Sequence, residues 1–238
     1  MTSWLRRYRE LPQARSRLVC FPYAGGSANV FRLWPKGLPT DVEVIAVQYP
    51  GRLDRLAEPA IDDMDALATR IADVLDRLPE KPTVLFGHSM GASIAYEVVR
   101  RLAVRPRLLV ASGHNAPHRA LAKPVPRTED EVIAEVREVD GAYEVLADPD
   151  LRELAMPALV ADYRLIRGYL PTAHPRRVPV PIVAYTGQLD PTASLEAVRG
   201  WSELTTSTFE LVSFPGGHFF LESDSDAVLA DLAARLQA

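Results

Sequence analysis

The sequence lacks the disulfides that stabilise many secreted proteins and the long apolar segments that anchor proteins in a membrane. Cys20 is the single cysteine among 238 residues, so no disulfide can form within the chain. A lone cysteine is typical of a reducing compartment. No stretch approaches the roughly 18 uncharged apolar residues that a membrane-spanning helix needs, and no apolar segment follows the basic N-terminus as it does in a signal peptide. We therefore expect a cytoplasmic protein with no membrane association.

A strong charge of either sign is also lacking. The chain has 27 basic and 31 acidic residues and a net charge of -4, so nothing suggests nucleic-acid binding. No metal cluster or nucleotide motif is visible, and we expect neither a metal nor another cofactor. The hydrophobic content of 47% is enough for one sizeable core. We expect one domain spanning residues 1–238, without repeats, and a monomer.

Short apolar runs alternate along the chain with longer segments of helical periodicity. Runs typical of buried strands are residues 42–47, 83–86, 108–111, 181–185 and 209–214. Apolar residues at helical spacing occupy residues 61–78, 90–102 and 226–236. Because parallel strands need crossover helices, this order predicts an α/β fold with a mostly parallel sheet and helices on both faces.

One region interrupts the alternation, because no good strand occurs between His118 and Pro179. Thr128 with three acidic residues after it resembles the start of a helix. Residues 151–169 predict one or two further helices, broken or started at Pro157. We expect residues 121–178 to form a helical lid over an active site; the alternative is a helical decoration without a gating role.

The segment Gly87-His88-Ser89-Met90-Gly91 matches the G-x-S-x-G motif. It follows a predicted strand and opens a predicted helix, which is the position of a nucleophile elbow. Such a turn forces the serine backbone into a strained conformation that costs about 1–3 kcal/mol. We predict that Ser89 is a nucleophile; the alternative is a strand–helix turn with an idle serine.

A serine hydroxyl needs a base to take its proton, and five histidines are available. We predict His218, because it follows the last strand and two glycines that can bring its ring over the sheet edge. His88 is expected to point away from the nucleophile and to support the site from behind. His114, His118 and His174 are expected mainly at the surface, although the first two could touch a substrate.

An acid should orient this base from a loop after an earlier strand, and Asp190 fits that place. The order Ser89, Asp190, His218 is that of the α/β-hydrolases. The alternative for Asp190 is a turn residue before Pro191. Asp162 and Asp140 are weaker competitors, because both lie in the helical insertion.

A developing oxyanion needs hydrogen-bond donors, and two backbone N–H groups are candidates. Met90 follows the nucleophile directly. Ala24 lies in a glycine-containing loop, residues 21–27, that follows an early apolar run. A plain glycine-rich turn is the alternative for this loop; it is not a phosphate loop, because no Gly-Lys-Ser/Thr follows.

Four blocks resemble the discrete type II thioesterases that accompany modular polyketide synthases and nonribosomal peptide synthetases. They are Phe21-Pro22-Tyr23-Ala24-Gly25-Gly26, Tyr49-Pro50-Gly51-Arg52, Gly87-His88-Ser89-Met90-Gly91 and Phe214-Pro215-Gly216-Gly217-His218-Phe219-Phe220. The resemblance runs from about Leu18 to Leu221, and it assigns the same triad and the same two oxyanion donors. Tyr23 stands where that family usually has histidine, and Thr186-Gly187 where it has two glycines, which bears on pocket shape.

The resemblance implies that the chain hydrolyses acyl groups from the phosphopantetheine arm of an acyl or peptidyl carrier protein, clearing stalled or wrong units from a synthase. The alternative is a stand-alone carboxylic ester hydrolase acting on small soluble esters with the same triad; transfer to an amine or alcohol is a third reading. Because carrier proteins are typically acidic, Arg119, Lys123 and Arg127 are candidates for docking them. Solvated surface arginines and lysines are the alternative.

Overall fold

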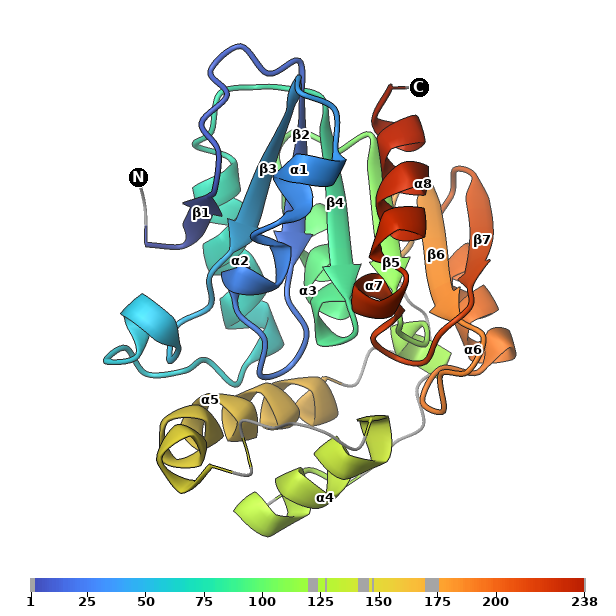
Figure 1. Ribbon diagram of the computed structural model, residues 1–238. Helices are drawn as coiled ribbons and strands as arrows, with labels where there is room; N and C mark the ends of the chain where they lie inside the picture. The colour runs from blue at the N-terminus through green and yellow to red at the C-terminus, as the bar shows by residue number, and fades with distance from the viewer. Residues whose placement is uncertain are drawn as a thin grey trace.

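A central β-sheet organises the protein in the computed structural model, which describes residues 3–119, 124–126, 128–140, 146, 148–169 and 176–237 (Figure 1). Within these residues the sheet has seven strands in the order β1-β3-β2-β4-β5-β6-β7. The strands are β1 (Leu5–Arg7), β2 (Ser16–Phe21), β3 (Val42–Val47), β4 (Thr83–His88), β5 (Leu108–Ser112), β6 (Ile182–Gly187) and β7 (Phe209–Phe214). All pairs are parallel except β1 with β3, so the predicted α/β fold is confirmed.

Helices cover both faces of this sheet. The α-helices are α1 (Trp34–Gly37), α2 (Met64–Leu75), α3 (Met90–Val99), α4 (Glu129–Asp140), α5 (Pro149–Gly168), α6 (Leu195–Arg199), α7 (Phe220–Ser223) and α8 (Ser225–Gln237). Short 3-10 helices span Ala28–Phe31, Leu53–Arg55, Pro117–Arg119 and Gly200–Leu204. In the described part of the chain, no helix combines the length and apolar character needed to cross a membrane.

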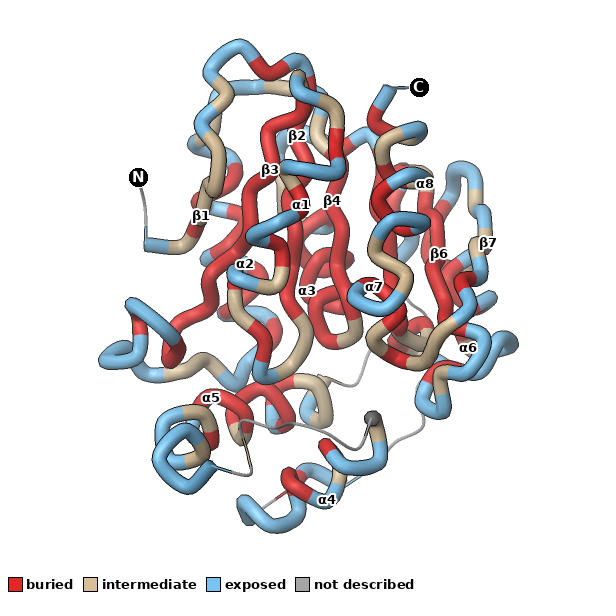
Figure 2. The backbone as a smooth tube through the Cα atoms, viewed as in Figure 1, coloured by how far each residue is buried: buried red, intermediate tan, exposed pale blue. Residues whose placement is uncertain are grey.

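Alternation along the strands sends side chains into two separate apolar cores. In β2, Val19 and Phe21 join the core beneath α2 and α3, whereas Leu18 and Cys20 join the core beneath α1 and α8. Figure 2 shows the middle strands buried along their whole length. A strand buried on both faces needs apolar side chains at nearly every position, which is why these runs stand out in the sequence.

The first strand, β1, was absent from the sequence-based prediction. It has only three residues, two of them arginines, and it lies at the edge of the sheet. Leu5 packs into the core, whereas Arg7 pairs with Glu43 of β3 through Nε at 2.7 Å, so one side chain of this strand makes apolar contacts and another makes an ion pair. An edge strand of this kind leaves no periodic apolar signal to detect.

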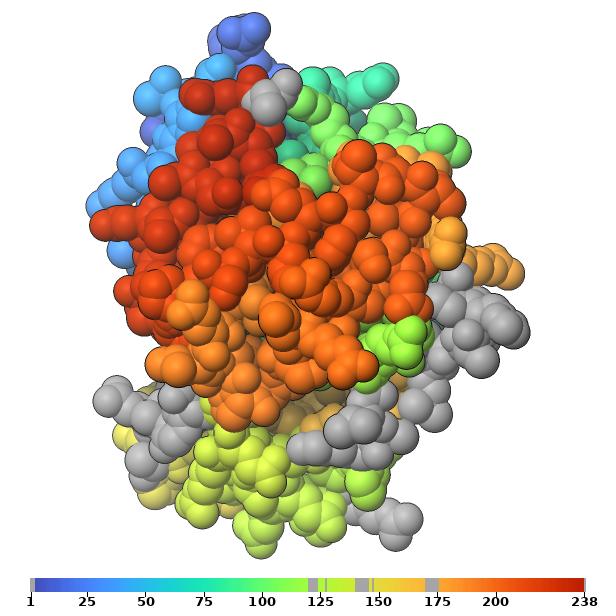
Figure 3. Space-filling model, turned by 90° about the vertical axis from the view of Figure 1, so that its right-hand side faces the viewer, coloured from blue at the N-terminus to red at the C-terminus, as the bar shows by residue number. Residues whose placement is uncertain are grey.

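Helices α4 and α5 lie beyond the carboxyl ends of the strands (Figure 1), and Figure 3 shows α4 at the same end of the molecule from another side. They pack on each other through an apolar cluster of their own: Val132, Ile133, Val136, Met156, Leu159 and Tyr163. Arg167 of α5 also pairs with Glu135 of α4. The described part of the 121–178 insertion is thus a helical layer above the sheet edge.

The expectation that Pro157 breaks or starts a helix was wrong. Helix α5 runs from Pro149 to Gly168 with Pro157 inside it. Its start is set instead by Asp148, whose carboxylate accepts hydrogen bonds from the N–H groups of Asp150 and Leu151. A proline within a helix removes one backbone hydrogen bond and bends the axis, and Figure 1 shows α5 changing direction along its length.

Candidate active site

Ser89 lies at the sharp turn between β4 and α3 with a backbone that L-residues rarely adopt. Its φ is 53° and its ψ is -123°. The turn is held by a 2.8 Å hydrogen bond from the Ser89 N–H to the carbonyl of Ser112 on the neighbouring strand β5. The predicted strained elbow is therefore confirmed, and it lifts the serine side chain to the carboxyl edge of the sheet.

The two glycines of the motif allow three backbones to meet at this turn. A Cβ atom on Gly87 would lie 2.1 Å from the carbonyl oxygen of Gly91. A Cβ on Gly91 would lie 2.2 Å from the carbonyl oxygen of Phe21, where β2 ends. Both positions must therefore lack a side chain if β4, α3 and the loop after β2 are to pack together.

His218 and Asp190 form a buried hydrogen-bonded pair. The Nδ1 atom of His218 lies 2.8 Å from Oδ2 of Asp190, and their side chains are 5% and 0% exposed. The hydroxyl of Thr192 donates to Oδ1 of Asp190 at 2.7 Å and lies 3.1 Å from the same His218 Nδ1. With Nδ1 engaged in this way, the Nε2 nitrogen of His218 is the one left for a serine or a substrate.

Thr192 was missed by the sequence analysis, and it also donates its backbone N–H to Asp190 at 2.8 Å. Burial alone would raise the pKa of Asp190. The hydrogen bond and charge of His218, together with both Thr192 hydrogen bonds, outweigh this effect and hold that pKa below its ordinary value. The carboxylate therefore stays ionised and can stabilise an imidazolium.

The loops that carry this pair meet because Gly187 lacks a side chain. A Cβ there would lie 2.3 Å from the carbonyl oxygen of Gly217. The end of β6 and the loop after β7 consequently approach backbone to backbone. This approach brings Asp190 and His218 together from positions 28 residues apart.

Ser89 and His218 line one small cavity at the carboxyl edge of the sheet. Its volume is about 40 Å³, and its other lining residues are Tyr23, Ala24, Val136, Val139, Tyr163 and Phe219. The two valines belong to α4 and Tyr163 belongs to α5, so the helical layer forms the roof. The cavity brings the Ser89 alcohol, the His218 imidazole and the predicted oxyanion loop together.

The remaining histidines have other surroundings. His88 is fully buried and bonded through Nδ1 to Ser112 Oγ at 2.9 Å, with its ring 5.2 Å from that of His218. Burial and the nearby His218 hold the pKa of His88 well below its ordinary value. This neutral imidazole packs beside the ring of His218, the histidine predicted to be the base.

His114 is half-buried rather than a freely solvated surface residue. Burial, the positive form of His218 and the Arg167 guanidinium lower the pKa of His114 to about 4. His118 contacts Glu203 through Nε2 at 3.1 Å. His174 lies outside the described residues, as do Lys123 and Arg127, whereas Arg119 is exposed and pairs with Glu203 at 2.7 Å.

The predicted oxyanion donors flank Ser89 from two elements. Met90 is the first residue of α3, where backbone N–H groups have no acceptor within the helix. Ala24 lines the cavity beside Ser89. The loop that carries Ala24 is a tight turn, in which the Gly26 N–H donates to the Tyr23 carbonyl at 2.9 Å and Gly25 has a φ of 75°.

Asp162, weighed from the sequence only as a rival to Asp190, has a different partner. Its carboxylate pairs with both terminal nitrogens of Arg52, and it also accepts the N–H of Gly25 at 2.8 Å. Asp140, the other competitor, ends α4. Across the part of the chain that the structure describes, no three His, Cys, Asp or Glu side chains are grouped as metal ligands.

Comparisons with known proteins agree with this geometry. Residues 16–236 match the family model described as "Thioesterase domain". The chain is 42% identical over 239 residues to the "Probable cadicidin biosynthesis thioesterase" of Streptomyces griseus and 38% identical over 242 residues to "Thioesterase PikA5" of Streptomyces venezuelae. Each match covers 98% of this chain, which spans 66% of the first relative and 85% of the second.

Solved structures give the same picture. The type II thioesterase BorB from the borrelidin biosynthetic cluster superposes with a TM-score of 0.89 at 39% identity. That match covers 98% of this chain and 97% of BorB. The similarity therefore extends over the sheet, the helical layer and the carboxyl edge where the cavity lies.

Proposed function

The chain belongs to the thioesterase family, and from this premise we propose that it is a serine thioesterase that hydrolyses acyl thioesters on the phosphopantetheine arm of carrier proteins. The observation that carries the proposal is the cavity that Ser89 shares with His218, whose ring is bonded to a buried Asp190. An alcohol, a base and an orienting acid in this order are what acyl transfer through a covalent intermediate requires.

In the proposed reaction, Ser89 Oγ attacks the thioester carbonyl while His218 Nε2 takes its proton. The backbone N–H groups of Ala24 and Met90 stabilise the oxyanion of the tetrahedral intermediate. Collapse breaks the carbon–sulfur bond, and the imidazolium gives its proton to the leaving thiol. Water, activated by His218, then attacks the acyl-serine ester, releases the free acid and restores Ser89.

The role we propose is removal of stalled or aberrant acyl units from a polyketide or nonribosomal peptide synthase. Relatives with "biosynthesis thioesterase" and "type II thioesterase" in their names support this proposal. The acyl or peptidyl carrier protein would then be the partner, and a cytoplasmic monomer would meet it there. The unpaired thiol of Cys20 is compatible with that compartment.

We also propose that α4 and α5 act as a lid. Ligand pockets usually measure about 300–1,000 Å³, whereas the cavity at Ser89 measures about 40 Å³ beneath the valines of α4. An acyl chain on its pantetheine arm needs more room than this. The lid must therefore move outward to admit the substrate, and its return would exclude bulk water from the acyl-enzyme.

The experiment is single-turnover hydrolysis of an acyl-loaded carrier protein, with release of free carrier followed by mass spectrometry. The wild-type protein should accelerate release, and S89A should lose roughly 10⁶-fold in kcat. A covalent acyl adduct should appear on the wild-type chain and be absent from S89A. Equal rates for the two proteins would refute the proposal.

The competing ester hydrolase is tested with the same preparation. Small soluble esters and pantetheine-linked thioesters of one acyl group are compared by kcat/KM. A carrier-editing enzyme should favour the pantetheine-linked form. Much faster turnover of the free esters would favour the stand-alone hydrolase, and an amide or ester product with added amine or alcohol would indicate acyl transfer.

A further inference from the structure

We propose that Asp162 and Arg52 are positioning residues that hold the oxyanion loop, residues 21–27, in its productive shape. The inference rests on the proposed function, because that proposal makes the Ala24 N–H an oxyanion donor. Neither side chain lines the cavity beside Ser89. Both act on the reaction through the backbone that carries Ala24.

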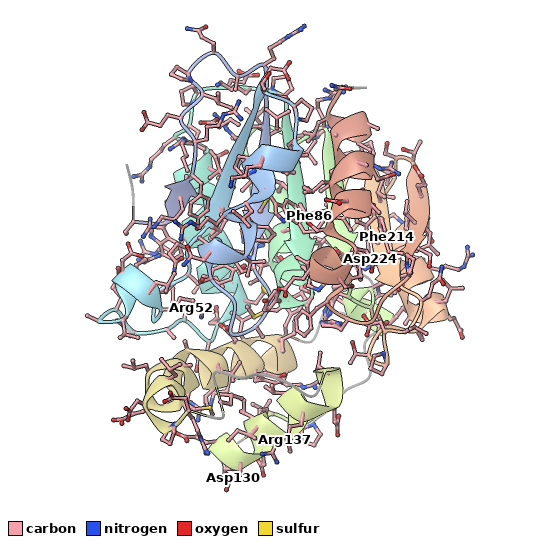
Figure 4. The ribbon with its side chains drawn as sticks, in the orientation of Figure 1. Arg52, Phe86, Asp130, Arg137, Phe214 and Asp224 are labelled. Carbon is pink, nitrogen blue, oxygen red and sulfur yellow. The ribbon has the colours of Figure 1, made fainter. Side chains whose placement is uncertain are left out.

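The two side chains form a buried, bidentate ion pair. Nη1 of Arg52 lies 2.7 Å from Oδ2 of Asp162, and Nη2 lies 2.8 Å from Oδ1. Their side chains are 9% and 2% exposed. Figure 4 shows Arg52 between the sheet and α5, the helix that contributes Asp162. A planar guanidinium facing a carboxylate in this way fixes orientation as well as distance.

The pair reaches the oxyanion loop at two adjacent residues. Oδ2 of Asp162 accepts the N–H of Gly25 at 2.8 Å, and Nη1 of Arg52 donates to the carbonyl of Gly26 at 3.0 Å. The Gly25 N–H belongs to the peptide group that follows Ala24. Fixing the plane of that peptide therefore fixes one side of Ala24 directly.

Residues near the two ends of the oxyanion loop are held by Gln48 and Tyr49, which lie close to Arg52 in the sequence. The hydroxyl of Tyr49 donates to the carbonyl of Pro22 at 3.2 Å, and the side chain of Gln48 accepts the N–H of Ala28 at 3.0 Å. Ala24 thus lies between two anchored points. Of the elements that supply these anchors, α5 is the one that belongs to the helical layer.

Stability alone is a weak reason for such a pair. Removing two charges from water offsets most of their attraction, and apolar replacements of buried ion pairs are often neutral or better. Geometry is a stronger reason, because the loop has Gly25 in the left-handed region and no sheet ladder to define it. Misplacing a reacting group by about 1 Å can cost on the order of 100-fold in rate.

The test is D162N, which keeps the size of the side chain but loses the charge and one acceptor. We expect kcat for a small acyl thioester to fall about 10- to 100-fold, less than the 10²–10³-fold that follows loss of a whole oxyanion donor elsewhere. KM and the pH profile of kcat/KM should stay unchanged, because Asp190 and His218 are untouched. Affinity for a boronic acid that forms a tetrahedral adduct on Ser89 should fall by the same factor as kcat.

A matched control is E43Q. Glu43 is also a buried carboxylate between arginines, Arg7 and Arg17, but it contacts neither the oxyanion loop nor the cavity. We expect this variant to lose stability while keeping kcat and boronate affinity. A similar loss of kcat in E43Q would show that general loosening explains the effect, and the inference would fail.

A second variant keeps the test decisive if D162N does not fold. R52K leaves a positive charge beside Asp162 but cannot bridge both carboxylate oxygens and the Gly26 carbonyl at once. It should also lower kcat and boronate affinity together. Folded R52K or D162N with unchanged kcat, or with a loss confined to KM, would overturn the inference.

The inference and the proposed function can fail separately. If the wild-type protein hydrolyses only small esters, the carrier-editing proposal fails. The comparison of kcat and boronate affinity then proceeds on those esters, because the same oxyanion forms. If kcat for the esters is unchanged in both D162N and R52K, the positioning role is refuted, whichever substrate the enzyme prefers.

Discussion

Single residues without side chains set the geometry of the nucleophile elbow. A methyl group on Gly91 would collide with the Phe21 and Pro22 carbonyl oxygens, which lie 2.2 and 2.6 Å from the Cβ position. We expect G91A to lower the free energy of unfolding by about 3 kcal/mol and to abolish turnover. Urea unfolding and thioester hydrolysis measure the two effects.

Gly168 provides the matched control for that substitution. It is also helical, at the end of α5, and a Cβ there would meet nothing within 4 Å. Alanine should therefore be tolerated and should stabilise the helix by up to about 1 kcal/mol. Equal destabilisation by G91A and G168A would show that close packing at the elbow is not the cause.

Histidine residues make the stability of the fold depend on pH. The pKa of His114 is lowered to about 4 and that of His88 lies well below its ordinary value, whereas unfolded histidine titrates near 6.5. Below about pH 6.5 the unfolded chain therefore binds protons that the native chain does not. The contribution of these two histidines to the free energy of unfolding should be complete above that pH. It should decrease toward pH 4, by at most about 1.4 kcal/mol per pH unit for each histidine.

Urea midpoints at pH 7, 6 and 5 measure this slope. The variant H114Q removes one of the two groups and should give a shallower decline. Asp190 also has a lowered pKa, but its contribution is lost only at lower pH, near and below the ordinary range of carboxylates. A decline of equal slope in H114Q and wild type would contradict the assignment.

At the residue scale, the candidate triad could be predicted because each member follows a recognisable strand. Ser89 has its motif, and Asp190 and His218 follow the last two apolar runs in the expected order. Thr192 and Asp162 could not be predicted in this way. Their roles depend on which backbone groups come within hydrogen-bonding distance, and neither spacing nor composition encodes that distance.

At the scale of elements, the strands that could be predicted from the sequence are those that are long and apolar. Strands β3 to β6 are buried along nearly their whole length, and the edge strand β7 is only partly buried but still reads as a six-residue apolar run, whereas β1, at the other edge, is short and charged. Helix α5 was misread at Pro157 because proline usually ends a helix, yet packing against α4 and the core offsets the lost hydrogen bond. Tertiary contacts of this kind override local preference.

Helix α4 should set the length of acyl chain that the enzyme accepts. Val136 and Val139 line the cavity beside Ser89. Replacing both with alanine enlarges the space, so kcat/KM for longer acyl thioesters should rise relative to short ones by about 10-fold. A series of acyl pantetheine thioesters differing by two carbons measures the preference.

Val132 is the control position on the same helix. It is fully buried between α4 and α5 but does not line the cavity. V132A should loosen the packing of the helical layer without changing the ratio of long-chain to short-chain turnover. A shift in that ratio equal to that of the double variant would mean that helix mobility, not cavity size, selects the chain.

At the scale of the whole molecule, net charge bears on how the proposed carrier protein, which we expect to be acidic, would dock. The chain has a net charge of -4, so attraction must come from a local group of basic residues. Arg119 is a described candidate, 54% exposed. R119E should raise KM for a carrier-linked substrate several-fold at low salt and leave a small thioester unaffected.

Arg105 serves as the control for charge reversal. It is exposed on the loop that leads into β5, at the amino ends of the strands, whereas Ser89 lies at their carboxyl ends. R105E should leave carrier KM nearly unchanged, and added salt should narrow the gap between R119E and wild type. Equal effects of R119E on carrier-linked and small substrates would argue against docking at this place.

The reactivity of Cys20 can be used to follow unfolding of the protein. Its thiol is fully shielded within β2, and burial raises its pKa well above the ordinary value. A maleimide can therefore reach it only after the sheet has separated, since the thiolate is the reactive form. The rate at which the adduct forms at Cys20, one per molecule, therefore measures how fast the central sheet opens, and no label has to be engineered.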